Sequence, residues 1–563
     1  MFTKFFAVLL AECLEYINNF MLDIKMYKKL SLLITSLSLV IILGSCSSSN
    51  SYTTNNTQSI GYYQAWVRSL LLEQYGIAEG NAYLMQNVDC PTFVAIFNSC
   101  FGQNPAAPYI IPQPPIGNSY VDPYYATALE TPGPNGMTDI LYRLSDNDAL
   151  ITIIAFPPTA AYFGYQSYLF TSNTSNYTGI TPNRSRTISP DPSRYDIFGS
   201  MGNDVNNVIV QNQYGITPWD GKVVMYITTS NKNLANTLIT NAKNRGINPN
   251  SIFVEPVGSN VITGNSSSAD DLITLIRYSV PKDPDAATAW INNVKNNVLV
   301  YKVTNANINI TRFGTNQYTP HEINNNETTL NTALQQLTTL LQNYLQQTET
   351  TEAISYQTQA TTSDNANGVP TDGLVGSNCI LYGTDCEGDN QDTSTYATLI
   401  ESSVILAPTD TAFIAGVNHS DIKQNNNIYL SVDIYNAADA SGVASSSQTN
   451  VTALGFNSGN LTGSAAQILT LLGIEIPVND IELTENISRL YATFVTRDCS
   501  NQTIKAANKY CINLKGTSLI PLTAPISITE RSYIVPGTTT GGYVPEMVYP
   551  YIIAAKHNFI TNP

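Results

Sequence analysis

The chain has 563 residues, of which 26 are Lys or Arg and 42 are Asp or Glu, so its formal net charge at pH 7 is −16. This balance argues against nucleic acid as a partner, because phosphate binding needs clustered Lys and Arg. Apolar residues make up 43% of the chain and charged residues only 12%, which indicates a folded globular protein and not a disordered one.

An N-terminal export signal is predicted at 26–45. Lys28 and Lys29 precede a short apolar core, and small residues follow it, which is the order of a secretory signal peptide. The core is too short to span a membrane comfortably. Residues 1–25 precede this complete signal, so translation starts at Met26 or 1–25 is an extended n-region. An ordinary signal peptide and a spanning helix that happens to contain a Cys are the alternatives.

The four residues LGSC at 43–46 resemble the lipobox of bacterial lipoproteins. The resemblance implies that Cys46 receives a diacylglycerol, that cleavage follows, and that the mature protein is held outside the cytoplasm by acyl chains such as palmitate. Two or three acyl chains anchor a protein firmly. Ser47 is not the Asp that marks inner-membrane retention in many lipoproteins, so the resemblance favours the outer membrane where the organism has one.

Beyond the lipid site the sequence predicts an α+β fold in two domains. A polar tether at 46–60 leads into an α+β domain at 61–349, and a polar linker or surface excursion at 350–393 separates it from a strand-rich domain at 394–563. A few amphipathic helices accompany the strands. No internal repeat at a fixed period is visible.

The first domain contains the clearest pattern of elements. A helix is predicted at 62–75, strands at 149–156 and 162–170, and a β-α-β unit at 221–257 whose helix begins after the cap Asn231. The strand–helix junction of this unit has no glycine-rich phosphate loop, so it predicts no nucleotide site. Further helices are predicted at 268–277, 285–297 and 330–345, with a strand at 298–303.

The second domain shows short strands at 404–406, 411–417, 428–435, 490–496 and 526–535, with a small helix at 465–472. Six cysteines remain after Cys13 and Cys46 are set aside, and they lie close together in pairs. Local pairing is the simplest of the 15 possible arrangements. The chain lacks C-x2-C spacing and has only three histidines, so neither a metal nor another cofactor is expected. The predicted disulfide pairs are Cys90 with Cys100, Cys379 with Cys386, and Cys499 with Cys511.

Catalytic signatures are largely missing from the sequence. It has no G-x-S-x-G elbow, no H-E-x-x-H and no Walker loop. His419 follows an apolar strand at a position where loops often hold function, so it is a candidate base; a hydrogen-bonded turn residue is the alternative. The adjacent Asp270 and Asp271 fit a solvated helix start better than an acid–base pair.

A second, wider pattern is similar to one in exported proteins of unknown function, and no activity is attached to it. It makes Arg143, His419 and Arg531 the first polar residues to mutate. The segments that carry it are LYRL at 141–144, PP at 157–158, YFGYQ at 162–166, VNH at 417–419 and ER-x-Y-x-x-PGTTT at 530–540.

These features favour a non-enzymatic envelope lipoprotein that contacts the membrane through its lipid. Tyrosines crowd the first third of the chain, and flat amphipathic rings suit recognition of a glycan, a peptide or an envelope protein. Tyrosine is also ordinary packing material in strand-rich proteins. The alternative function is a lipid-anchored hydrolase or lyase that uses His419.

Overall fold

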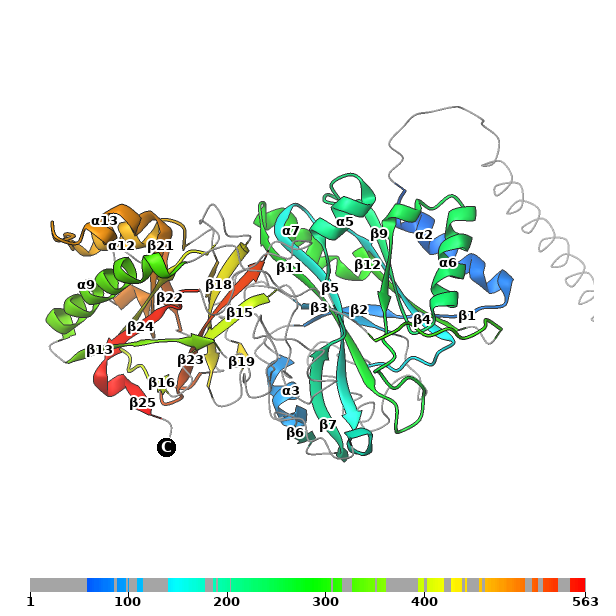
Figure 1. The fold of residues 1–563 in the computed structure, drawn as a ribbon, viewed down its shortest axis with the longest axis horizontal. Coiled ribbons are helices and arrows are strands. Elements are labelled where there is room, and N and C mark those ends of the chain that lie inside the picture. Colours follow the sequence, from blue (N-terminus) through cyan, green and yellow to red (C-terminus); the bar gives the residue numbers. More distant parts are fainter. Residues whose placement is uncertain are drawn as a thin grey trace, which may run out of the picture. The chain divides into compact units, whose positions relative to one another are not determined.

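The fold is built from two halves with sheets of their own, at 58–315 and 327–561 (Figure 1). All described residues belong to one compact unit, Gln58–Pro563. The computed structural model describes these two ranges except 86–88, 98–99, 101–108, 115–139, 178–185, 189–190, 203 and 305–306 in the first, and 350–351, 361–392, 399–401, 420–426, 438–440, 443–454, 458–460, 502–508, 515–519 and 535–546 in the second.

The first half contains a five-stranded sheet with the order β1-β12-β4-β9-β10. Its neighbours are antiparallel except β9 and β10, which are parallel and joined by α6. The predicted β-α-β unit is therefore present, and the Asn231 side chain accepts from the backbone of Asn233 and Leu234 as the predicted cap. The bounds are β1 (Gly76–Glu79), β4 (Asp148–Ala155), β9 (Val223–Thr229), α6 (Lys232–Asn244), β10 (Ile252–Pro256) and β12 (Val298–Thr304).

The second sheet of this half has the order β2-β3-β11-β5-β7-β6, and β8 also pairs with β5. Short helices accompany the two sheets. The bounds are α2 (Ile60–Ser69), β2 (Asn81–Met85), α3 (Cys90–Phe97), β3 (Tyr109–Gln113), β5 (Ala160–Asn173), β6 (Arg186–Ile188), β7 (Asp191–Ser200), β8 (Val205–Asn206), α5 (Asn207–Tyr214), β11 (Asp271–Pro281), α7 (Pro284–Asn292) and α8 (Val294–Asn297).

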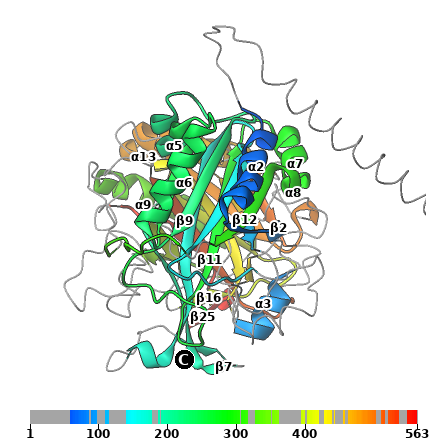
Figure 2. The same ribbon diagram turned by 90° about the vertical axis from the view of Figure 1, so that its right-hand side faces the viewer.

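Three layers stabilise the first half. Helices α2 and α6 pack on one face of the five-stranded sheet, through residues such as Trp66 and Leu238, and Figure 2 shows α2 and α6 beside β9 and β12. The opposite face packs against the second sheet through residues such as Leu150 and Ile276. Because both faces of the five-stranded sheet are covered, β4 and β9 are buried along almost their whole length.

The segment predicted as a helix at 268–277 is instead a strand, because β11 runs from Asp271 to Pro281 in the middle of the second sheet. The prediction rests on an amphipathic, capped pattern with acids in the first turn, at 269–271. The first nine residues of β11 are buried. A strand buried on both faces shows no alternation of polar and apolar residues, so periodicity cannot separate it from a helix.

The second half repeats the same kinds of layer. Its five-stranded sheet has the order β13-β24-β17-β21-β22. A larger sheet contains β14, β15, β23, β16 and β25, and in it β18 pairs with β23 while β19 and β20 pair with β18. The bounds are β13 (Ala353–Gln357), β14 (Gln359–Ala360), β15 (Thr393–Thr398), β16 (Ser402–Val404), β17 (Thr411–Val417), β18 (Asn427–Asn436), β19 (Ser441–Gly442), β20 (Gly455–Asn457), β21 (Leu490–Thr496), β22 (Cys511–Asn513), β23 (Ile526–Ile534), β24 (Tyr551–Ala555) and β25 (Phe559–Thr561).

Helices α9 (Asn331–Glu349), α12 (Ser464–Leu472) and α13 (Ile481–Asn486) pack on one face of that five-stranded sheet. Leu334 and Leu341 of α9 lie in one apolar cluster with Phe413 of β17. By packing, α9 thus belongs with the second half, whereas the domain boundary expected from composition counted it with the first. The α+β class expected from the sequence is the class observed.

Two of the predicted disulfides lie among the described residues. Cys90 and Cys100 are bonded, with 5.2 Å between their Cα atoms, and so are Cys499 and Cys511, with 6.0 Å. The predicted pair Cys379 and Cys386 lies outside the described residues, as does the predicted lipid site Cys46. Among the described helices, none is long and apolar enough to cross a membrane.

Candidate functional site

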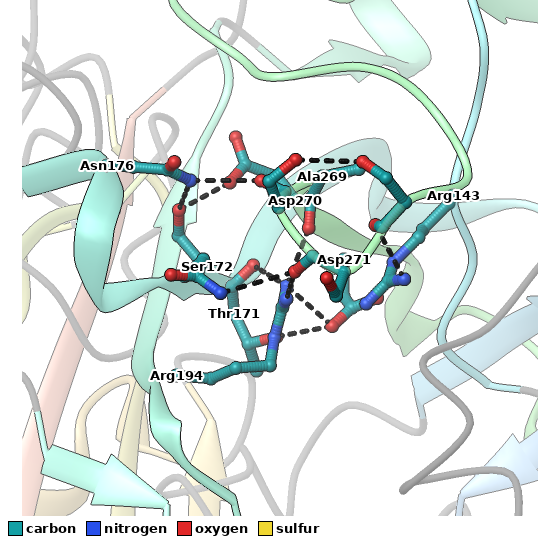
Figure 3. Close-up of polar contacts among 12 residues, drawn as sticks. Arg143, Thr171, Ser172, Asn176, Arg194, Ala269, Asp270 and Asp271 are labelled. Carbon is teal, nitrogen blue, oxygen red and sulfur yellow. Dashed lines mark hydrogen bonds and ion pairs between the residues drawn. The ribbon is translucent and has the colours of Figure 1, made fainter.

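Arg143 lies in a buried group of charged side chains on the second sheet of the first half (Figure 3). Its Nε atom donates to Asp271 Oδ1 at 2.7 Å, and Arg194 contacts Asp271 Oδ2 at 2.8 Å. Thr171 also donates to Asp271 Oδ2, at 2.6 Å. One carboxylate is therefore shared by two guanidinium groups, and the side chains of Arg143, Arg194 and Asp271 are at most 2% exposed.

These two arginines also hold the chain segment before β11. Arg143 donates to the carbonyl oxygen of Ser266 at 2.9 Å, and Arg194 donates to those of Ser267 and Ala269 at 2.9 and 2.8 Å. Buried arginines that donate to several carbonyls fix a loop because each lost bond leaves a buried polar group unsatisfied. The arrangement explains Arg143 as a positioning residue for the segment 266–269.

Asp270, next to Asp271 in sequence, has different surroundings. It accepts from the hydroxyl of Ser172 and from the backbone of Ile262, the latter at 2.7 Å. Burial raises the pKa of Asp270 to about 6, although these hydrogen bonds and Arg194 act in the opposite direction. The pair predicted as a solvated helix start is thus buried, with Asp271 in ion pairs and Asp270 bound mainly by neutral donors.

His419 lies two residues after the end of β17 and is completely buried between two carboxylates. Its Nδ1 is 2.8 Å from Glu327 and its Nε2 is 3.1 Å from Glu530. Burial alone would lower the pKa of His419, but the two carboxylates raise it to about 10. The ring is therefore a cation at neutral pH, with both nitrogens donating to carboxylates.

The two carboxylates are themselves tied to other elements. Glu530 of β23 accepts from the hydroxyl of Tyr491 on β21, and Glu327 accepts from the backbone of Val548 at 3.1 Å. A general base needs a neutral, accessible nitrogen. The geometry around His419 instead fits an internal ion triad that holds five segments of the second half together.

Arg531 follows Glu530 on β23. Its Nε lies 3.9 Å from Asp433 Oδ2, and its guanidinium carbon lies 5.3 Å from the ring centroid of Tyr435. Burial raises the pKa of Asp433 to about 6, against the effect of Arg531. The three candidates Arg143, His419 and Arg531 thus lie in three groups with different partners.

Sequence reasoning missed a buried carboxyl group that is bound by neutral donors, that of Glu255 on β10. It accepts from the hydroxyls of Ser167 and Thr228 at 2.5 and 2.7 Å, and from the backbone of Ser167. Burial raises the pKa of Glu255 to about 7. The signal that could have found it is a lone acidic residue inside an apolar strand, IFVEP, and Glu530 in ISITERSYI follows the same pattern.

The tyrosines of the first third are mostly core residues. Tyr63, Tyr162, Tyr165 and Tyr168 are at most 1% exposed, whereas Tyr62 is 42% exposed. Packing therefore accounts for most of those that the structure describes. Among the described residues, no group of three or more His, Cys, Asp or Glu side chains has the arrangement of a metal site.

The chain is similar to two solved structures whose descriptions name no function. No family model matches the chain, and no curated protein matches it. A solved structure of an uncharacterized protein from Burkholderia cenocepacia is 8% identical, with 90% of each chain covered and a TM-score of 0.33. The VPA0106 protein from Vibrio parahaemolyticus is 9% identical, with 88% of this chain and 96% of that one covered and a TM-score of 0.31.

Proposed function

We propose that this protein is a lipoprotein of the cell envelope, acylated at Cys46, whose folded body serves a non-catalytic binding or structural role. The observation that carries the proposal is the motif LGSC at 43–46, directly after a charged start and a short apolar core. Two closed disulfides support export, because such bonds persist mainly in oxidising compartments.

The non-catalytic role is supported by the state of the candidate residues. Arg143 and His419 are buried, and each has its charge balanced by carboxylates. Charged side chains used in this way fix loops and strands, and a substrate cannot reach them without displacing internal ion pairs. A glycan, a peptide or an envelope protein remains the expected partner, and the outer membrane the expected location.

Acylation is tested by metabolic labelling with an alkyne analogue of palmitate in cells that express the full chain. Wild type should carry the label and sediment with membranes. Cys46→Ser should lose both properties, whereas Cys13→Ser, a control at the other N-terminal cysteine, should keep them. Labelling that survives in Cys46→Ser would refute the lipid site.

Catalysis by His419 is tested with the protein lacking its lipid, screened against chromogenic esters and envelope glycans. His419→Gln and wild type should be equally inactive. Turnover by wild type that disappears in His419→Gln, while the variant keeps its native circular dichroism spectrum, would instead favour the hydrolase or lyase.

A further inference from the structure

The two halves share one strand order in their five-stranded sheets. In the first half β1 pairs with β12, β12 with β4, and β4 with β9. In the second half β13 pairs with β24, β24 with β17, and β17 with β21. These three steps are antiparallel in both halves, and the fourth step, β9 to β10 or β21 to β22, is parallel in both. Both the order and the directions therefore coincide.

The second sheets coincide as well. The path β2-β3-β11-β5 in the first half matches β14-β15-β23-β18 in the second, and every step is antiparallel. One helix of each half also has a matching place in the chain, because α5 precedes β9 and α12 precedes β21. An agreement of nine strands, in order and direction, is not expected of two unrelated units.

A turn before the central strand repeats in atomic detail. In the first half the Asp148 backbone donates to the carbonyl oxygen of Ser145 at 3.0 Å, and the Asp148 carboxylate accepts from the Ser145 backbone at 3.0 Å. In the second half Asp410 and Ala407 form the same two bonds, at 3.1 and 2.9 Å. The same side chain thus closes the same turn at the start of β4 and of β17.

One arginine occupies the same position in both halves. Arg277 of β11 pairs in register with Tyr109 of β3, and Arg531 of β23 pairs with Tyr396 of β15. On the other side, the strands β5 and β18 pair with the two arginine strands in matching register. Arg277 pairs with Gly164 and Arg531 pairs with Ser431. Tyr168 and Tyr435 each lie four residues further along the chain, so their positions are equivalent.

One tyrosine neighbour of each arginine matches too. The guanidinium carbon of Arg277 is 5.4 Å from the ring centroid of Tyr168, and that of Arg531 is 5.3 Å from the ring centroid of Tyr435. Arg277 lies also 5.2 Å from the ring centroid of Tyr109. Both arginines are buried, at 1% and 6% exposure. A buried guanidinium costs desolvation, so its presence in both halves is not explained by hydrophobic packing alone.

We infer that residues 58–315 and 327–561 are two copies of one α+β unit, and that Arg277 and Arg531 are the same positioning residue in each copy. Each arginine seats its tyrosine ring by a cation–π contact, which suits the flat guanidinium, and Arg277 also donates to the hydroxyl of Tyr168 at 2.5 Å. In this way Arg277 ties β11 to both β3 and β5, and Arg531 ties β23 to β18.

Hydrogen–deuterium exchange on the full chain carrying Cys46→Ser tests this inference. Arg277→Met should raise exchange at least tenfold in peptides from β3, β5 and β11 and leave those from β15, β18 and β23 unchanged, and Arg531→Met should do the reverse. The Lys variants at both positions should lie between Met and wild type. Arg68→Met, at an arginine that is 59% exposed, is the control and should change neither set.

A second measurement covers variants that fail to fold. A protease site inserted within 316–326 and cleaved in the folded protein should leave both fragments with their protected strands. The inference is overturned if cleavage unfolds either half, or if the Arg277 and Arg531 variants act on both halves alike or differ more than tenfold in effect.

Discussion

At the scale of residues, several buried charged side chains hold segments of the molecule together, and each has specific partners. Asp270 and Asp271 are neighbours in sequence, yet one is bound mainly by neutral donors and the other is shared by Arg143 and Arg194. The sequence shows two adjacent acids and cannot show which of them has a cation beside it. This difference makes the two positions a matched pair for mutation.

Asp271→Asn should destabilise the first half by about 3–5 kcal/mol, because it leaves two buried guanidinium groups without their carboxylate. Asp270→Asn should cost far less at neutral pH, since that carboxylate is bound by a hydroxyl and a backbone amide. All three tryptophans, Trp66, Trp219 and Trp290, lie in the first half. Urea unfolding followed by tryptophan fluorescence therefore reports on it, and equal losses in the two variants would contradict the assignment.

His419→Gln should destabilise the second half by about 3–5 kcal/mol, because Glu327 and Glu530 then remain buried without a cation between them. Adding Glu327→Gln to His419→Gln should recover part of the loss, since one of the two like charges is removed. Far-UV circular dichroism in urea measures both effects. If the double variant has a lower free energy of unfolding than His419→Gln alone, the triad is not the source of the stability.

The protonation of His419 can be observed directly. Its pKa is raised to about 10, so its imidazole should stay charged from pH 5 to pH 9. The chain has only three histidines, so the His419 signal in NMR spectra is identified by its absence in His419→Gln. Titration of this signal near pH 6.5 would contradict the ion triad.

At the scale of elements, prediction from sequence succeeded where caps and turns mark the boundaries. The β-α-β unit at 221–257 was predicted because Asn231 caps the helix and Gly246 follows it. It failed for β11, whose residues are buried on both faces and leave no alternation to read. Local sequence signals such as caps identify an element. They do not show whether strands that are distant in the sequence bury it on both faces.

Asn231→Ala should lower the stability of the first half by about 1 kcal/mol, because the first turn of α6 and the backbone of Thr311 lose their side-chain acceptor. Asn236→Ala, at an exposed position of the same helix, should change it by a few tenths of a kcal/mol at most. Tryptophan fluorescence in urea again measures both. An equal effect at the two positions would mean that the cap contributes nothing.

At the scale of the whole molecule, the matching halves escaped sequence reasoning because their loops differ in length. Tyr109 and Tyr396 are 287 residues apart, whereas Arg277 and Arg531 are 254 apart, so no fixed period exists to be found. Few residues are identical between equivalent strands of the two halves, and the strand order becomes visible only from the hydrogen-bonded pairing of the strands. The sequence could identify some of the candidate residues, because a lone charge among apolar residues is visible in it. It could not identify their partners, because these lie far away along the chain.

The buried carboxyl groups also give the whole molecule one pH dependence. Burial raises the pKa of Glu255 to about 7 and the pKa values of Asp270 and Asp433 to about 6. A carboxyl group whose pKa is higher in the folded than in the unfolded state binds its proton more tightly when folded. It therefore contributes stability that is present below about pH 4 and is lost as the pH rises through the folded value. His419 has the same sign, since its raised pKa makes its contribution decline from about pH 6.5 to pH 10.

We therefore expect the free energy of unfolding to fall between pH 5 and pH 8, with Glu255 alone accounting for about 2–3 kcal/mol. Above this window Lys302 opposes the trend, because burial lowers its pKa to about 8 in spite of Asp148. Glu255→Gln keeps an acceptor for the Ser167 backbone and should flatten the profile of the first half. Urea unfolding at pH 5 and pH 8 measures the difference. If Glu255→Gln and wild type lose equal stability over this interval, Glu255 is not the buried acid that sets the slope.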